Sequence, residues 1–201
     1  MKRSFTLAAA FMLATAALAH AQTAPAPGKA VAIFAAGCFW CVESDFDKVD
    51  GVIATISGYT GGKEANPNYG QVSAGGTGHT EAVEITYDPA KVSYQKLLDH
   101  FWRNVDPFAK DRQFCDSGKQ YRSAIFYRND AEKKLAEASK KSVEERFKKK
   151  VETEIVPAST FYAAEDYHQD FYVKSATRYK FYRWNCGRDR RLEELWGKKT
   201  S

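Results

Sequence analysis

Apolar and polar positions in the first part of the chain predict two strands around a helix. Residues 30–36 (AVAIFAA) form an apolar run of strand length that stops at Gly37, and residues 39–48 then show helical spacing. Residues 52–59 (VIATISGY) alternate as a second strand. The pattern therefore predicts a strand, a tight turn, a helix and a strand.

A long irregular stretch separates these elements from the next ones. Residues 60–78 are rich in Gly, Asn, Pro and Ser. Such a long irregular stretch inside a compact domain is more often a functional loop than a connection without a function. Beyond it, the pattern predicts a strand over residues 80–87, a helix over 93–105 with one apolar face, and a strand over 121–127. The order β-α-β-β-α-β indicates a split α+β arrangement, with an antiparallel sheet and helices packed on one face.

The last third of the chain predicts additions to this core. A charged helix covers residues 129–150, and a strand over 151–156 is stopped by Pro157. Residues 164–174 show helical spacing, and residues 185–197 predict a short closing helix. We therefore expect additional C-terminal helices and one further strand around a single core.

The N-terminus has the pattern of a secretory signal over residues 1–21. Lys2 and Arg3 precede an apolar run over residues 7–18, and Ala19-His20-Ala21 then provides a small-x-small cleavage site. The apolar run is shorter than the roughly 20 residues that span a bilayer. We expect an exported protein, periplasmic or secreted, whose mature chain does not insert into the membrane.

The remaining chain predicts one domain. Residues 22–29 predict a flexible spacer and residues 30–197 a single catalytic domain, long enough to bury a core, and we expect a monomer. Formal charge is +5, or +3 once Lys2 and Arg3 leave with the signal. The densest basic stretch, residues 148–150, closes a helix, where cations suit the helix dipole. We therefore expect no nucleic-acid partner.

Cysteine usage points to redox chemistry or metal binding. The four cysteines are Cys38, Cys41, Cys115 and Cys186. An oxidising compartment normally makes an even set a disulfide framework. A domain of this size does not need such a framework, and the Cys38/Cys41 pair closes a loop too small to give much entropic stabilisation.

Cys38 lies where the first strand turns into the first helix. Free N–H groups and a partial positive charge at a helix N-terminus favour the thiolate, the nucleophilic form, and Gly37 allows the sharp turn. A lone cysteine is more often a small buried hydrophobe. Here a second cysteine, Cys41, follows three residues later on the same helical face, which favours a chemical role for Cys38 instead.

Three kinds of C-x-x-C site compete for this pair. Covalent haem attachment needs His directly after the pair, where the chain has Val42. Structural zinc needs a second close pair, and neither the other two cysteines nor the mature histidines have ligand spacing, so we expect no metal. The histidines are His79, His100 and His168. Thioredoxin-like chemistry remains open, although the split strand order argues against that fold.

Six ordered segments resemble the A-type peptide methionine sulfoxide reductases. They are GCFWCVE, GYTGG, NPNYGQV, GTGHTEAVEITYDP, FCDSGKQYRSAIF and FYAAEDYHQDF, and the resemblance covers nearly all of residues 30–197. It implies a ferredoxin-like α+β core and no bound metal or cofactor. It also implies reduction of free and peptide-bound methionine (S)-sulfoxide to methionine, which repairs oxidised proteins, with an external thioredoxin-like dithiol as reductant.

The resemblance assigns roles to residues of this chain. Cys38 matches the nucleophile, and Glu81 matches the proton donor to the sulfoxide oxygen. Tyr69 and Tyr121 match two phenols that hydrogen-bond this oxygen, and Asp116 matches an accompanying carboxylate. A sulfoxide sulfur is electrophilic only if its oxygen gains a proton, and a desolvated carboxyl has a pKa high enough to supply one. From the residues alone, Glu81 could equally be an exposed strand glutamate, and the tyrosines could be packing residues.

Two aromatic residues also match the family pattern, and two cysteines differ from it. Phe39 and Trp40 match an aromatic wall that receives the S-methyl group, although they could equally be core residues. Cys41 is Gly in many members, and Cys115 is a polar residue in many. His79 and His168 are left outside the catalytic set, because a structural role is the commoner one for a histidine.

The resolving cysteine is chosen by geometry. A disulfide needs Cα atoms within about 7 Å, which Cys41 approaches with a small rearrangement. Cys186 lies in a Gly-containing segment near the C-terminus and resolves through a mobile tail, or carries the bond onward to the reductant. We predict Cys41 first, Cys186 second and Cys115 third.

Two other functional classes remain open. A general thiol–disulfide oxidoreductase would reduce a generic disulfide and ignore methyl sulfoxides. A binding module for methionine peptides would bind them without thiol-dependent turnover. Assays with separate sulfoxide epimers distinguish these classes.

Overall fold

The computed structural model describes residues 27–198. Its strands are β1 (Ala30–Ala36), β2 (Val52–Thr60), β3 (Thr80–Tyr87), β4 (Arg112–Gln113), β5 (Asp116–Ser117), β6 (Ser123–Tyr127), β7 (Glu154–Pro157) and β8 (Tyr162–Ala163). Its helices are α1 (Phe39–Phe46), α2 (Tyr69–Ala74), α3 (Tyr94–Trp102), the 3₁₀ turn η1 (Lys119–Tyr121), α4 (Asp130–Phe147), α5 (Phe171–Lys174), α6 (Ala176–Asn185) and α7 (Arg188–Trp196). The predicted signal and most of the predicted spacer lie outside the described residues. In the described part, no helix is both long and apolar enough to cross a membrane.

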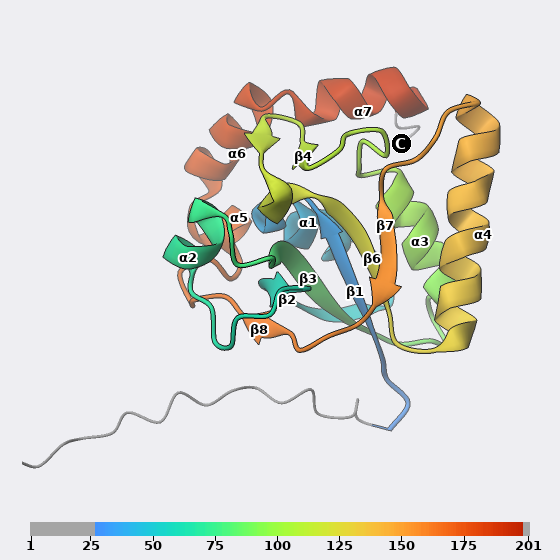
Figure 1. Cartoon of the computed structure of the whole chain (residues 1–201), viewed down its shortest axis with the longest axis horizontal. Helices are drawn as coiled ribbons and strands as arrows, with labels where there is room; N and C mark the ends of the chain where they lie inside the picture. Colours follow the sequence, from blue (N-terminus) through green and yellow to red (C-terminus); the bar gives the residue numbers. More distant parts are fainter. Residues whose placement is uncertain (1–26, 199–201) are drawn as a thin grey trace, which may run out of the picture.

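One mixed sheet organises the domain. Its strand order is β7-β6-β1-β3-β2-β8, and only the β6–β7 pair is parallel among its pairings (Figure 1). β1 lies at the centre, which explains its unbroken apolar run, because both of its faces are covered. A separate two-stranded hairpin, β4–β5, lies outside this sheet.

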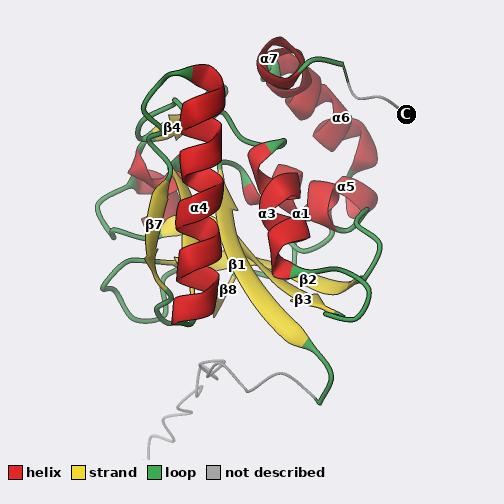
Figure 2. Ribbon diagram, turned by 90° about the vertical axis from the view of Figure 1, so that its right-hand side faces the viewer, coloured by secondary structure: helices red, strands yellow, loops and turns green. Residues whose placement is uncertain are grey.

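The two faces of the sheet are covered differently. Helices α1, α3 and α4 pack on one face, where Phe34 of β1 packs against Phe46 of α1 and Phe101 of α3, in a core cluster that also includes Ala136 of α4 (Figure 2). The opposite face carries a smaller cluster around Ile33, which Phe161 covers from the segment between β7 and β8. The prediction of a mixed α and β domain with helices packed on a central sheet is confirmed, and the sheet is mixed rather than purely antiparallel because β7 pairs parallel to β6.

Several elements differ from the sequence-based expectation. The helix expected over residues 164–174 is only the single turn α5, because Ala164 still donates its N–H to Ser57 of β2 and the left-handed Asp170, with φ +53°, directly precedes α5. The loop expected over residues 60–78 contains α2, whose first turn is closed by a reciprocal capping box between Asn68 and Gln71. The hairpin β4–β5 and the helix α6 were not predicted.

The C-terminal helices are fixed to the catalytic half of the domain by a buried arginine. Arg188, 2% exposed, donates to the carbonyl oxygens of Ala36 at 3.1 Å and Asn104 at 2.6 Å. Asp45 of α1 lies 3.6 Å from the Arg188 guanidinium and 2.9 Å from that of Arg183. Since an unpaired buried charge is costly, these contacts hold α6 and α7 firmly beside α1.

Candidate active site

Cys38 lies at the N-terminus of α1, as the sequence predicts. Gly37 precedes it with φ +85°, and a Cβ there would lie 2.5 Å from the Cβ of Gln113, so only glycine fits this turn. Cys38 is the N-cap residue, and its carbonyl accepts the N–H groups of Cys41 and Val42 at 3.1 and 3.3 Å. The strand-to-helix turn therefore places the thiol at the positive end of a helix.

The two thiols of the C-x-x-C pair are buried together, and they differ in acidity. Burial raises the pKa of Cys38 well above its usual value, and the hydrogen bond and charge of Cys41 add to this rise. A hydrogen bond from Cys38 lowers the pKa of Cys41, and the charges of Arg188 and Arg183 lower it further. Of the two thiols, Cys41 is therefore the more acidic. This differs from the expectation that the helix N-terminus alone favours a Cys38 thiolate, because burial outweighs it.

Glu81 is a buried carboxyl group beside the start of α1. It lies on β3 opposite Tyr59, and its Oε2 accepts the backbone N–H of Phe39 at 3.0 Å. Its pKa is raised to about 8, chiefly by burial; the Phe39 N–H opposes this rise, and the charges of Asp116 and Cys41 contribute to it. Glu81 is therefore protonated near neutral pH. Because its side chain is buried, the alternative that Glu81 is an exposed strand glutamate is wrong.

Tyr69 and Tyr121 come from turns that follow irregular segments. Tyr69 begins α2 and Tyr121 ends η1, and both are half-buried. Burial raises the pKa of each phenol, and the next cause for each is the nearby charge of Glu81. The structure thus brings both predicted phenols to the same carboxyl group.

Glu165 fixes α2 against the sheet and was missed by sequence reasoning. One carboxylate oxygen accepts the backbone N–H of Tyr69 at 2.8 Å, and the other accepts the hydroxyl of Tyr59 at 2.8 Å. The AEDYHQ motif that contains it was a visible signal. Glu165 therefore holds Tyr69 in place through its backbone.

Phe39 and Trp40 differ in burial. Phe39 is 1% exposed and packs against Tyr59 and His168, with ring centroids 5.9 and 5.0 Å away. Trp40 is half-buried, stacks on Phe171 at 3.8 Å, and donates its indole N–H to Nδ1 of His168 at 3.0 Å. Phe39 is therefore also a core residue, whereas Trp40 is held by an aromatic stack and by His168.

Asp116 is paired with a tyrosine that sequence reasoning missed. The hydroxyl of Tyr182 on α6 donates to Oδ2 of Asp116, and a hydrogen bond with Tyr182 acts to lower the pKa of Cys38. The ring of Tyr182 also meets that of Trp40 edge-on, with centroids 5.8 Å apart. Tyr182 therefore lies between the predicted carboxylate, the predicted nucleophile and the aromatic wall. It was missed because α6 was not predicted.

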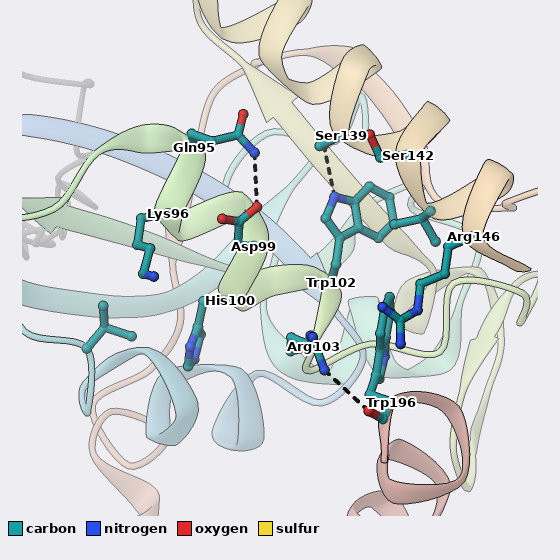
Figure 3. Close-up of a pocket in the computed structure, with 12 residues that line it drawn as sticks. Gln95, Lys96, Asp99, His100, Trp102, Arg103, Ser139, Ser142, Arg146 and Trp196 are labelled. Carbon is teal, nitrogen blue, oxygen red and sulfur yellow. Dashed lines mark hydrogen bonds between the residues drawn. The ribbon is translucent and has the colours of Figure 1, made fainter. Parts of the chain in front are cut away.

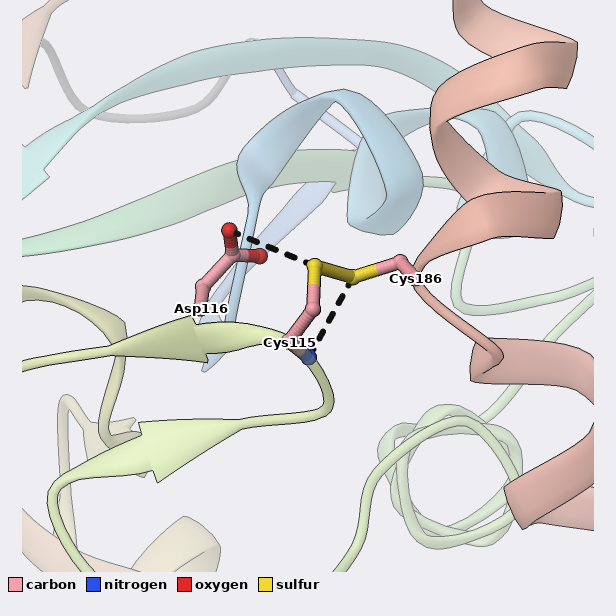
Figure 4. A group of neighbouring side chains, drawn as sticks. All are labelled: Cys115, Asp116 and Cys186. Carbon is pink, nitrogen blue, oxygen red and sulfur yellow. Dashed lines mark hydrogen bonds between the residues drawn. A yellow bond between two sulfur atoms is a disulfide. The ribbon is translucent and has the colours of Figure 1, made fainter.

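The other two cysteines form a disulfide. Cys115 at the tip of the β4–β5 hairpin is bonded to Cys186 at the end of α6, with Cα atoms 4.9 Å apart (Figure 4). Cys38 and Cys41 are free thiols. Cys186, the second candidate for the resolving cysteine, is thus bonded to Cys115, which was the third candidate. The molecule carries a buried dithiol and a separate disulfide.

A cavity away from these residues lacks their chemistry. It has a volume of about 730 Å³ and lies among α3, α4 and Trp196 of α7 (Figure 3). Its lining includes Trp102, whose indole N–H donates to Ser139 at 2.9 Å, and no cysteine. The chemistry therefore lies at Cys38, where a nucleophile, an acid and three phenols converge.

Comparison with known proteins agrees with this arrangement. A family model described as peptide methionine sulfoxide reductase matches residues 30–200. The chain belongs to this family. Peptide methionine sulfoxide reductase MsrA of Bacillus licheniformis is 48% identical over 171 residues, which cover 84% of this chain and 94% of that protein. An MsrA protein of Caulobacter vibrioides is 46% identical over 198 residues, covering 98% of this chain and 100% of that one.

Solved structures share the fold. Mxr1 from Saccharomyces cerevisiae in its reduced form is 31% identical, with a TM-score of 0.71 over 74% of this chain and 87% of that one. Methionine sulfoxide reductase A of Corynebacterium diphtheriae is 33% identical, with a TM-score of 0.68 over 75% of this chain and 77% of that one. The reductase described here therefore reduces methionine sulfoxide, and a general thiol–disulfide oxidoreductase fits less well.

Proposed function

We propose that this reductase acts on the S epimer of methionine sulfoxide, free and in peptides, with Cys38 as nucleophile and Glu81 as general acid. The observation that carries this assignment is the buried Glu81 carboxyl, with a pKa of about 8, beside the first turn of the helix that presents Cys38. A protonated acid and a thiol at one point are what sulfoxide reduction requires.

The reductive step follows from these positions. Cys38 attacks the sulfoxide sulfur while Glu81 gives its proton to the oxygen; methionine leaves, the oxygen remains on Cys38 as a sulfenic acid, and the thiol proton restores Glu81. Tyr69 and Tyr121 hold the oxygen, while Asp116 accompanies them. Phe39 and Trp40 receive the S-methyl group. No metal or bound cofactor takes part in this step.

Cys41 is proposed as the first resolving residue. Its thiol attacks the Cys38 sulfenic acid, a Cys38–Cys41 disulfide forms, and water leaves. The proposal is supported by the hydrogen bond between the two buried thiols and by the lowered pKa of Cys41, since thiolate is the attacking form. Cys186 remains the alternative.

The resolving step is tested by mapping disulfides after one equivalent of methionine sulfoxide without reductant. Fully reduced wild type is expected to form Cys38–Cys41 first, seen by mass spectrometry of rapidly quenched samples. Cys41→Ser is expected to slow disulfide formation, whereas Cys186→Ser leaves this first bond unaffected. A Cys38–Cys186 bond formed in Cys41→Ser at the wild-type rate would contradict the direct route.

The reductant is proposed to be a thioredoxin-like dithiol protein. Mxr1 has also been solved in a complex with Trx2. Exchange with such a dithiol returns the enzyme to its thiol form and oxidises the partner. Since residues 1–21 have the pattern of a secretory signal, the partner is proposed to be exported too, in the periplasm or outside the cell.

Epimer selectivity tests the proposed substrate. A fixed oxygen site and a fixed methyl site accommodate only one arrangement around a chiral sulfur, so the S form is expected to react and the R form to be inert. The assay supplies each epimer separately with dithiothreitol and measures methionine. Comparable rates for both epimers would refute the stereochemical assignment, and reduction of generic disulfides alone would favour a general oxidoreductase.

The finer fold assignment and the assembly state are also proposals. The core order β6-β1-β3-β2, with antiparallel pairings, supports a ferredoxin-like split β-α-β-β-α-β core. A monomer is proposed, and sedimentation of the mature protein tests it.

A further inference from the structure

The aromatic wall of the active site is connected to the surface through α5 and α6. Trp40 stacks on Phe171 of α5, with ring centroids 3.8 Å apart. The guanidinium of Arg178 on α6 lies over the same Phe171 ring, 5.7 Å from its centroid. Phe171 is buried, whereas Arg178 is exposed. One buried ring therefore separates a positive charge at the surface from the wall of the proposed substrate site.

The charge of Arg178 is held in place without a carboxylate partner. Among residues 27–198, the neighbouring cations are paired, Lys174 with Asp170 at 3.9 Å and Arg183 with Asp45 at 2.9 Å, but no ion pair includes Arg178. Its contact with the Phe171 ring is of the cation–π kind, which orients the guanidinium without neutralising it. The planar group therefore remains available for a carboxylate on a bound molecule.

Other cations on this side of the site add to the same potential. Residues 171–188 contain five Lys or Arg side chains and no Asp or Glu. Two of the five are largely buried and pair with Asp45. The three exposed ones are Lys174, Arg178 and Lys180. A polypeptide that lies over α5 and α6 therefore meets a positive surface.

The surface on the other side of the aromatic wall has the opposite charge. His168 accepts the indole N–H of Trp40, and its ring centroid lies 4.2 Å from that of Tyr167, which is 59% exposed. Glu165 and Asp166 directly precede Tyr167 in the chain, and Asp166 is exposed. The charge around the site is therefore polarised, negative beside Tyr167 and positive over α6.

The dimensions of this surface match a short peptide segment. A methionine sulfoxide side chain that reaches Trp40 brings the neighbouring residues of its chain to the surrounding surface. An extended chain advances about 3.3 Å per residue, so residues one to three positions from the sulfoxide pass the Phe171 ring and Arg178 on one side. An aspartate or glutamate at such a position can pair with the Arg178 guanidinium.

We propose that Arg178 selects protein substrates in which an aspartate or glutamate lies within about three positions of the methionine sulfoxide on one side, bound over α5 and α6. The proposal rests on the proposed function, because it extends the same site, and it names a class of protein substrate. Free methionine sulfoxide has no neighbouring residues and does not make this contact.

The test compares peptides that differ only in the charge beside the sulfoxide. A neutral peptide with a central methionine (S)-sulfoxide receives aspartate or lysine, either two positions before or two positions after it. Dithiothreitol is the reductant, and kcat/KM is measured with the mature protein. At one of the two positions, wild type is expected to prefer aspartate over lysine about fivefold, the size of an exposed ion pair. Raising the salt concentration is expected to reduce this preference.

Variants of Arg178 assign the preference to this residue. Arg178→Gln is expected to remove it, and Arg178→Glu is expected to reverse it in favour of lysine. Turnover of free methionine (S)-sulfoxide is expected to be unchanged in both variants, which shows that the site is intact. Lys134→Glu is the matched control, because it makes the same charge change at an exposed position of α4, across the molecule from α5 (Figure 1). It is expected to keep the wild-type preference.

Several outcomes would overturn the proposal. They are an aspartate preference that persists in Arg178→Glu, one that disappears equally in Lys134→Glu, and one of equal size at both peptide positions, because the last two would reflect the net charge of the protein. An equal loss of turnover with free sulfoxide in the Arg178 variants would give Arg178 a role in the structure of the wall instead. If wild type releases no methionine from any peptide or from free sulfoxide, the proposed function itself fails.

Discussion

Replacing Cys38 by serine is expected to abolish sulfoxide reduction while the domain stays folded. A serine hydroxyl is far less acidic than a thiol, and no strong base lies beside position 38 to activate it, so the sulfoxide sulfur is not attacked. Serine is also a favoured N-cap residue and is close to cysteine in size, so α1 is expected to begin normally. Methionine release with dithiothreitol measures the effect, and circular dichroism confirms the fold.

The Cys38→Ser variant also separates binding from chemistry. It is expected to retain a sulfoxide-containing peptide, because Tyr69, Tyr121 and Trp40 are unchanged, so it competes with wild type for limiting peptide. Methionine release above the enzyme-free background would remove Cys38 from the role of nucleophile.

Glu81→Gln is expected to slow the reductive step by roughly 10²- to 10⁴-fold, the usual size of a general-acid contribution. Glutamine retains an oxygen for the Phe39 N–H but has no proton to transfer. The rate constant for methionine formation in a single turnover measures this loss. Glu84→Gln on the same strand is the matched control, because its side chain lies on the opposite face of β3. An unchanged rate constant in Glu81→Gln would exclude Glu81 as the acid.

The pH dependence of this loss follows from the raised pKa of Glu81. Burial raises the pKa to about 8, so the acid form is complete below this pH and disappears as the pH rises through it. The ratio of the wild-type to the Glu81→Gln rate constant isolates the contribution of Glu81, and since ionised Glu81 also raises the pKa of Cys38, both effects of its ionisation lower this ratio. This ratio is expected to be constant below pH 8 and to fall about tenfold per pH unit above it. A ratio independent of pH would refute a titrating Glu81.

The core could be predicted from the sequence because its patterns are local. Residues 30–36 and 80–87 form the strands expected, since a central strand needs a continuous apolar run and its neighbour a half-apolar one. Cys38 could be placed at a helix start for the same reason, because a glycine follows a strand and helical spacing begins after it.

Other features depend on contacts between distant parts of the chain. α6 carries aromatic and basic residues with little apolar periodicity, so no pattern distinguished it, and Tyr182 was missed with it. The acidity of the two thiols depends on burial and on arginines far along the chain, which no local motif reports. The Cys115–Cys186 bond was equally hidden, because 71 positions separate its cysteines.

The hydrogen bond from Arg188 to the carbonyl of Ala36 spans 152 positions, from the turn that presents Cys38 to the last helix. During synthesis, the amino-terminal strands and helices emerge long before this arginine does. The catalytic turn therefore lacks its buried partner until α7 has been synthesised. A chain that stops before α7 is expected to retain the elements of the sheet but to leave the thiol unrestrained, so the synthesis of α7 determines when the nascent protein becomes an enzyme.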